Sequence, residues 1–279
     1  MKGLLLINLG SPDSTDVKDV KKYLAEFLMD ERVIGKSYLF RLFLVKGIIL
    51  NFRPKKSAAA YKKIWWDEGS PLIVLSQRLF DKVKNLVDMP SALAMRYGSM
   101  SIKKGIQELH DQGVDEITVL PLYPHYAMSS YESVVVKVEQ DISKHFSHIS
   151  TNVIPAFYND PLYKQAMINN VKHHLKGIDY DYMLFSYHGL PESHLKISDP
   201  TNFHCQGNNC CNKGSVAHTT CYRHQVFETT KDIVKGLGLK EGTYSNAFQS
   251  RLANEPWLKP YTDSELERLA KEGIKKVVV

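Results

Sequence analysis

Two short segments of the chain contain the side chains best suited to chemistry, and the first contains a single histidine. Residues 184–191 read Leu-Phe-Ser-Tyr-His-Gly-Leu-Pro, an apolar strand pattern that stops at His188. A neutral imidazole, with an ordinary pKa of about 6.5, can accept a proton or bind a divalent metal at neutral pH. Parallel α/β proteins place such groups just past the carboxyl ends of their strands. We therefore predict that His188 is catalytic, with a purely structural histidine as the alternative.

The second segment contains every cysteine of the protein. Its four thiols are Cys205, Cys210, Cys211 and Cys221. Glycines and asparagines between them allow the positive φ values needed to fold thiolates around a small centre. Four thiolates suit tetrahedral zinc or an iron–sulfur cluster, and a cytosolic chain keeps its thiols reduced. Free thiols are one alternative, and mixed zinc ligation stays open because three histidines lie nearby: His204, His218 and His224.

Other strand ends in the first half of the chain carry an arginine and aromatic side chains. Arg96 and Tyr97 end one predicted strand, and Tyr123 ends another, with His125 two residues further on. An arginine in such a position can bind a carboxylate, and tyrosine rings offer flat apolar faces. Surface or core packing is the alternative for Arg96 and the tyrosines, core packing for Trp257, and a solvated loop histidine for His125. The chain contains no Walker A, G-x-G-x-x-G or G-x-S-x-G motif, so nucleotide binding and serine hydrolysis have no support.

The bulk composition is that of a soluble globular protein. The 279 residues are 43% hydrophobic and 24% charged, and the net charge is +6. Because this charge is moderate and spread along the chain, we expect no nucleic-acid partner. Residues 33–52 are the most apolar stretch, but basic residues interrupt it, so it reads as a core helix, the lip of an apolar pocket or a surface that rests on a membrane. We expect a cytoplasmic protein with residues 33–52 available for peripheral membrane contact.

The elements that must position these residues alternate along the chain. Short apolar strands alternate with amphipathic helices, which predicts an α/β fold with parallel sheets. Two series of elements look alike, because residues 7–12 and 185–191 both run from a strand through a small-residue turn to a proline. We therefore predict two similar lobes with a cleft between them. The N-terminal lobe spans residues 1–157, and the C-terminal lobe spans residues 158–279, with the cysteine segment as an insertion at about 201–221.

The individual elements can be placed from their patterns. A capping-box pattern at Thr262–Glu265 predicts the start of a helix. Helices with one apolar face are expected over 17–28, 102–109, 134–142 and 226–234. Strands are expected at 4–9, 92–97, 116–123, 151–154, 182–185 and 243–248, and a further strand begins at 275–279.

Segments distributed along nearly the whole chain resemble the ferrochelatases. The histidine segment is the part most specific to that family. The matching segments are 8–12 (Asn-Leu-Gly-Ser-Pro), 23–28 (Tyr-Leu-Ala-Glu-Phe-Leu), 69–72 (Gly-Ser-Pro-Leu), 95–98 (Met-Arg-Tyr-Gly), 122–126 (Leu-Tyr-Pro-His-Tyr), 186–191 (Ser-Tyr-His-Gly-Leu-Pro), 248–251 (Phe-Gln-Ser-Arg) and 257–260 (Trp-Leu-Lys-Pro).

The resemblance implies an enzyme with two Rossmann-like, chelatase-type lobes that inserts ferrous iron into protoporphyrin IX or coproporphyrin to make haem. It implies that His188 lies beside the inner porphyrin nitrogens, where it takes up a proton or guides the Fe²⁺ substrate. Residues 33–52 match the apolar lip of the family's cleft. The positions that match porphyrin contacts are Leu9, Arg96, Tyr97, Tyr123 and Trp257.

The cysteine segment is longer than the family pattern in this region. Some bacterial ferrochelatases carry a [2Fe–2S] cluster on such an internal segment. The resemblance therefore implies a [2Fe–2S] cluster, with zinc as the alternative, on Cys205, Cys210, Cys211 and Cys221.

Two other departures from the family pattern concern the C-terminal lobe. The family's acidic partner of the histidine follows the strand that here ends at Val279, so we expect a C-terminally truncated chain that lacks this partner and could be inactive. In addition, Leu252-Ala253-Asn254 stands where Phe-Gly is common. The remaining functional alternatives are a related chelatase for another metal or tetrapyrrole and a non-catalytic tetrapyrrole- or metal-binding protein.

Overall fold

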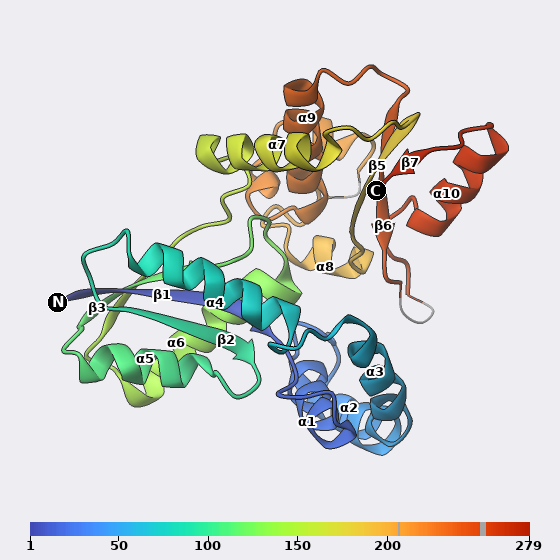
Figure 1. The fold of residues 1–279 in the computed structure, drawn as a ribbon. Coiled ribbons are helices and arrows are strands. Elements are labelled where there is room, and N and C mark those ends of the chain that lie inside the picture. The colour runs from blue at the N-terminus through green and yellow to red at the C-terminus, as the bar shows by residue number, and fades with distance from the viewer. Residues whose placement is uncertain (206, 252–254) are drawn as a thin grey trace. The chain divides into compact units, whose positions relative to one another are not determined.

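The protein forms two compact units, drawn in Figure 1 from a computed structural model that describes residues 1–205, 207–251 and 255–279. The N-terminal unit comprises Met1–Tyr123 and Met128–Ala156, and the C-terminal unit comprises Pro124–Ala127 and Phe157–Val279. The departure from the family pattern at 252–254 lies outside the described residues. Each unit contains its own sheet of parallel strands, so the predicted α/β class is confirmed.

The N-terminal unit is a four-stranded parallel sheet with helices on both faces, as Figure 1 shows. Its elements are β1 (Lys2–Gly10), β2 (Ser91–Tyr97), β3 (Glu116–Pro121), β4 (Ser150–Val153), α4 (Pro71–Lys84), α5 (Ile102–Asp111) and α6 (Ser133–His145). The strand order is β2-β1-β3-β4. Leu5 and Ile7 of β1 pack with α5 and α6, whereas Leu6 between them packs with Phe80 of α4. This division follows because successive side chains of a strand point to opposite faces.

A mostly helical segment joins β1 to α4. It consists of α1 (Val17–Met29), α2 (Tyr38–Leu42), a π-helical stretch (Phe43–Ile49) and α3 (Leu50–Ile64). Val45 and Leu50 are buried in one cluster with Tyr97. Other large apolar side chains of the same stretch stay exposed: Tyr38, Leu39, Phe40, Phe43 and Phe52. Residues 33–52 are therefore partly core and partly an exposed apolar surface.

Among the described residues, no helix has both the length and the apolar character needed to cross a membrane.

The C-terminal unit is a smaller, three-stranded parallel sheet with the order β6-β5-β7. Its strands are β5 (Tyr182–His188), β6 (Tyr244–Gln249) and β7 (Val277–Val278), and its helices are α7 (Pro161–Leu175), α8 (Glu192–Ile197), α9 (Tyr222–Leu237) and α10 (Thr262–Lys271). Figure 1 shows α10 on one side of the sheet and α7 and α9 on the other. The central strand β5 ends at His188, so the carboxyl edge of this sheet presents the predicted catalytic residue.

The helix predicted to open near Thr262 forms, but the capping-box prediction for its first turn is wrong. Tyr261 occupies the N-cap position, and no side-chain hydrogen bond caps the helix. The reason is that Thr262 already lies inside the helix, where its hydroxyl makes a hydrogen bond of 2.8 Å with Ser186 of β5. The Thr262 side chain therefore ties α10 to the sheet.

Candidate functional site

His188 occupies the last position of β5, where it pairs with Gln249 of β6. The backbone N–H of Gly189 donates to the Gln249 carbonyl at 2.6 Å, so the chain turns immediately after the histidine. A Cβ atom on Gly189 would lie 2.8 Å from that oxygen and 3.4 Å from Cε3 of Trp257. This close approach explains the glycine. It also places Trp257, which forms a backbone bridge with Pro191, beside the His188 turn.

The surroundings of His188 favour its neutral form. The residue is exposed, but nearby protein atoms displace enough water to lower the pKa of its imidazole from 6.5. Partial burial acts in this direction because it disfavours the charged imidazolium. Tyr222, the first residue of α9, makes a side-chain hydrogen bond with the His188 backbone. At neutral pH His188 is therefore an uncharged base on an anchored stretch of backbone.

His125 is packed inside the C-terminal unit. Its ring lies edge-on to the rings of Tyr187 and Tyr222, with centroid distances of 6.1 and 6.0 Å. Its Nε2 makes a hydrogen bond of 2.8 Å with the Thr229 hydroxyl. Burial lowers the pKa of His125 to about 4, so its imidazole is neutral at pH 7. His125 thus packs against Tyr187, which precedes His188, and against Tyr222, which hydrogen-bonds with the His188 backbone.

Arg96, in β2, belongs to a buried network centred on a carboxylate. Its Nη2 lies 2.5 Å from Asp30 Oδ2, and its Nε donates to Ser133 Oγ at 2.7 Å. The Tyr97 hydroxyl donates to the same Asp30 oxygen at 2.9 Å. Burial acts to raise the pKa of Asp30, but hydrogen bonds from Ser133 and from the Arg32 backbone, together with the Arg96 charge, lower it. The carboxylate that Arg96 binds in this structure is therefore the protein's own.

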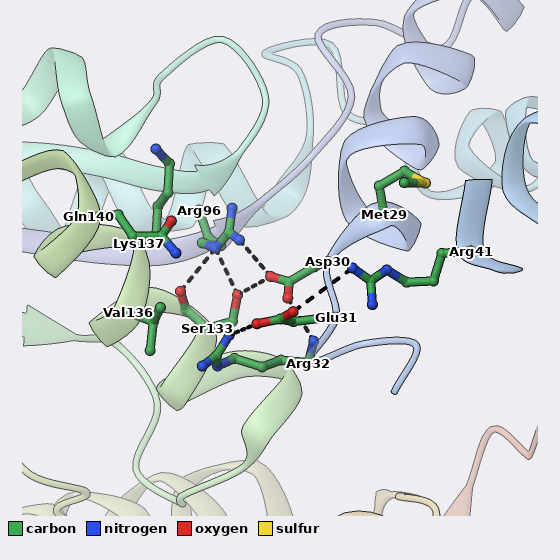
Figure 2. Close-up of a pocket in the computed structure, with 10 residues that line it drawn as sticks. All are labelled: Met29, Asp30, Glu31, Arg32, Arg41, Arg96, Ser133, Val136, Lys137 and Gln140. Carbon is green, nitrogen blue, oxygen red and sulfur yellow. Dashed lines mark hydrogen bonds and ion pairs between the residues drawn. The ribbon is translucent and has the colours of Figure 1, made fainter. Parts of the chain in front are cut away.

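The Arg96 network lines a polar pocket with a volume of about 230 Å³, shown in Figure 2. Of the cations that line the pocket, Arg41 has the most distant carboxylate partner. Its side chain is 9% exposed, and its Nη2 lies 3.9 Å from Glu31 Oε2. The other cations that line the pocket have closer carboxylates, in the pairs Arg32–Glu132 at 3.1 Å, Arg96–Asp30 at 2.5 Å and Lys137–Asp141 at 2.5 Å. Each cation thus has a carboxylate within 4 Å, but only two of these carboxylates, Asp30 and Glu31, line the pocket itself.

The other predicted contact residues of the N-terminal unit lie among aromatic side chains. Tyr97 is 1% exposed and packs edge-on against Tyr23 and Phe27, with centroid distances of 6.3 and 5.2 Å. Leu9 packs against the same cluster. The Tyr123 hydroxyl is buried without a hydrogen-bond partner among the described residues, and burial raises its pKa. One unit thus contains four of the predicted contacts, Leu9, Arg96, Tyr97 and Tyr123, and the other unit contains Trp257 with His188.

The cysteine segment brings the four thiols together without a disulfide. Cys221 hydrogen-bonds with both Cys205 and Cys211. Arg223 donates from Nε to Cys211 Sγ at 3.2 Å and from Nη2 to Cys210 Sγ at 3.0 Å. The sulfur atoms therefore converge at the N-terminus of α9. We call the four cysteines and Arg223 the cysteine site.

Side chains around the cysteine site bind its backbone. The Asp199 carboxylate accepts hydrogen bonds from the backbone N–H groups of His204 and Cys205 at 2.8 and 2.7 Å. Three imidazoles hydrogen-bond with backbone carbonyls, His204 and His218 with Cys210 at 2.9 and 3.0 Å and His224 with Cys211 at 2.9 Å. Within the described part of the chain, no group of three or more His, Cys, Asp or Glu side chains is placed to hold a metal ion. The predicted metal at the cysteines therefore stays a prediction.

Several residues of these sites were not identified from the sequence, among them Asp30, Ser133, Tyr222 and Arg223. Asp30 and Ser133 are 66 and 37 residues away from Arg96 along the chain, and no local pattern links them to it. Tyr222 directly follows Cys221, so its place beside the cysteine segment was visible in the sequence. Its hydrogen bond with the His188 backbone was not, because that contact depends on how α9 packs against β5.

Comparison with known proteins now adds to this geometry. The family model described as Ferrochelatase matches residues 1–279. A ferrochelatase of Opitutus terrae is 47% identical over 282 residues, covering 100% of this chain and 81% of its own length. A ferrochelatase of Stutzerimonas stutzeri is 42% identical over 281 residues, covering 100% of this chain and 82% of its own length. One of Pseudomonas fluorescens is 43% identical, covering 99% of this chain and 81% of its own length. The resemblance seen in the sequence is confirmed, and the chain belongs to the ferrochelatase family.

Proposed function

We propose that this protein inserts ferrous iron into protoporphyrin IX or coproporphyrin in haem biosynthesis. The observation that carries the proposal is the match with ferrochelatases along the whole chain, which includes the histidine segment. The proposed domains are residues 1–157 and 158–279, and the division into two compact units supports them. As a porphyrin metal chelatase the protein is an enzyme of the lyase class.

His188 is the proposed catalytic residue. A free-base porphyrin carries two inner N–H protons, and both must leave as the Fe²⁺ ion enters. A neutral imidazole can accept one of these protons or guide the Fe²⁺ ion toward the ring. The lowered pKa of His188 supports this role because it keeps the imidazole uncharged, and therefore able to accept a proton, at neutral pH.

Five residues are proposed to contact the porphyrin. Leu9 and the Tyr97 and Tyr123 rings offer apolar surface to the macrocycle, and Trp257 offers another ring beside the His188 turn. Arg96 is proposed to act from a fixed orientation, since its Nε donates to Ser133 and its Nη2 donates to Asp30. The buried, unpartnered Tyr123 hydroxyl supports a ligand nearby, because such a group costs free energy until something binds it.

The cysteine site is proposed to bind a [2Fe–2S] cluster through Cys205, Cys210, Cys211 and Cys221, with zinc as the alternative. The convergence of the sulfur atoms supports the proposal, since four thiolates are the usual ligand set of such a cluster. When bound, the cluster supplies a one-electron redox centre and a covalent link between the loop and α9. Since the proposed catalytic residue is His188, the proposed role of the cluster is structural or regulatory.

The protein is proposed to be cytoplasmic. Its residues 33–52 are proposed to make peripheral contact with a membrane surface. The exposed fractions of Leu39 and Phe52, 75% and 78%, support this because exposed apolar side chains beside basic ones bind lipid surfaces. Replacement of both by glutamate is expected to abolish cosedimentation with anionic phospholipid vesicles, and unchanged cosedimentation would contradict the contact.

An iron-insertion assay with a matched histidine pair tests the proposed activity. His188→Ala is expected to lower turnover by about 100-fold or more, since a positioned acid–base group contributes 10²–10⁴-fold. The control is His173→Ala, which removes an exposed histidine of α7. Porphyrin fluorescence quenching measures binding separately and should change little in either variant. Normal turnover by His188→Ala would exclude the proposed mechanism, and a comparison of the two porphyrins identifies the substrate.

Metal analysis of anaerobically purified protein tests the proposed cofactor. About two irons per chain, with visible absorption, are expected for a [2Fe–2S] cluster. Stoichiometric zinc in a colourless protein would replace the cluster with a zinc site.

A further inference from the structure

Arg223 is a partly buried cation whose side-chain partners are sulfur atoms. It is the second residue of α9, directly after Tyr222 and two residues after Cys221. Its Nε and Nη2 groups donate to Cys211 Sγ and Cys210 Sγ at 3.2 and 3.0 Å. Among the described residues no carboxylate forms an ion pair with Arg223, in contrast to the four cations of the polar pocket. Its positive charge is therefore directed at the thiols.

The charges around the cysteine site are distributed unevenly. Burial acts to lower the pKa of Arg223, but the negative charge that Cys211 and Cys210 can carry raises it. The pKa of the Cys205 thiol is raised, first by burial and then by the negative Asp199, while the Arg223 charge acts in the opposite direction. The nearby imidazoles bind backbone oxygens of the loop. Among the described residues, Arg223 is thus the cation that donates hydrogen bonds to the sulfur atoms, and it does so to two of the four.

We propose that Arg223 is a redox-tuning residue of the cysteine site, which raises the reduction potential of the cluster by donating N–H···S hydrogen bonds to Cys210 and Cys211. The inference rests on the proposed [2Fe–2S] cluster. Reduction adds one electron, and so one negative charge, to the cluster and its thiolate ligands. A fixed positive charge and N–H donors at the sulfurs stabilise that added charge more than they stabilise the oxidised state.

The shape of the arginine side chain matters as well as its charge. The planar guanidinium presents N–H groups in a fixed fork, so it can serve two sulfur atoms at once. A lysine keeps the charge but offers a single ammonium group on a flexible stem. Arg223→Lys should therefore retain part of the effect, and Arg223→Gln should lose most of it.

Redox titration of the anaerobically purified protein tests the proposal. Dithionite supplies the electrons, and visible absorption and electron paramagnetic resonance report the oxidised and reduced clusters. The midpoint potential is expected to become more negative in Arg223→Lys and still more negative in Arg223→Gln. The control is Lys213→Gln, which removes an exposed positive charge from the same loop without touching a sulfur, and its potential should equal that of the unmodified protein.

The possible outcomes separate this inference from the proposed cofactor. A protein that binds zinc, or no metal, shows no titratable cluster in the unmodified chain, and the cofactor proposal fails together with this inference. A cluster whose potential is the same in Arg223→Gln as in the unmodified protein refutes the tuning role alone, even if less cluster is bound. Should Arg223→Gln bind no cluster, Arg223→Lys decides: a more negative potential supports the proposal and an unchanged one overturns it.

Discussion

The polar pocket of the N-terminal unit and the cysteine site of the C-terminal unit each contain a partly buried arginine, but the partners differ in kind. Arg96 lies 2.5 Å from the Asp30 carboxylate, with side chains that are 12% and 5% exposed. Arg223 donates to the sulfur atoms of Cys210 and Cys211 at 3.0 and 3.2 Å. A carboxylate is an anion at neutral pH, whereas a thiol becomes one only when it loses its proton, as it does on binding metal. The Arg96 charge is therefore neutralised within the protein, whereas the Arg223 charge is matched only where the thiols lose their protons.

The largest effect is expected from breaking the Arg96 network. Asp30→Ala leaves the Arg96 guanidinium buried without its counter-ion, and breaking one side of a buried pair costs about 3–5 kcal/mol. Urea unfolding should show this loss in the free energy of unfolding. The matched control is Asp179→Ala, which removes a carboxylate that is 82% exposed and paired with Lys276. A surface pair of that kind contributes about 0–1 kcal/mol, so equal losses in the two variants would contradict the self-contained Arg96 network.

Acid should lower the stability of the two units through different titrating groups. His125 of the C-terminal unit has a pKa of about 4, against 6.5 when unburied. Between these values the unfolded chain binds more protons, so stability is present above pH 6.5 and falls as the pH drops toward 4. The shift corresponds to about 3 kcal/mol. Asp30 has a pKa below 3.8, so its contribution is lost only as the pH falls below that value.

Urea unfolding at a series of pH values between 7 and about 4.5 checks this difference. His125→Gln should flatten the decline in the free energy of unfolding over that range. Asp30→Asn should lower stability at every pH in the range without changing the slope. If the free energy of unfolding of His125→Gln declines as steeply with falling pH as that of the unmodified protein, His125 is not the group that causes the decline.

The same two regions show what a sequence can predict. The strands followed from apolar patterns that are local, and the cysteine site was visible because its cysteines lie within one short segment. The Asp30 partner of Arg96 was invisible, because a buried ion pair between distant positions leaves no periodic signal. Helix α7 was also missed, and the reason is that none of its described side chains is fully buried, so it has no apolar stripe. Apolar residues of 33–52 lie both in the core and on the exposed surface, so their pattern could not separate the two.

A smaller effect is expected from crowding the turn after His188. In Gly189→Ala the new Cβ would lie 2.8 Å from the Gln249 carbonyl, so the turn must shift, at a cost of about 1–3 kcal/mol. The shift moves His188, so iron insertion should fall as well. Gly214→Ala in the cysteine segment is the control, because nothing lies within 4 Å of its Cβ position. Its free energy of unfolding should stay within about 0.5 kcal/mol of the unmodified protein.

The smallest effect tests whether the start of α9 serves both sites. Tyr222 lies between Cys221 and Arg223 of the cysteine site, and its side chain hydrogen-bonds with the His188 backbone. Tyr222→Phe removes that hydrogen bond and keeps the ring, so it should cost about 1 kcal/mol of stability. We expect kcat for iron insertion to fall several-fold with KM unchanged, because the substitution loosens His188 and leaves the porphyrin contacts in place. The control is Tyr180→Phe, which should leave both constants unchanged. Tyr180 precedes β5, and its hydroxyl has no hydrogen-bond partner among the described residues. An unaltered kcat in Tyr222→Phe would show that α9 serves the cysteine site alone.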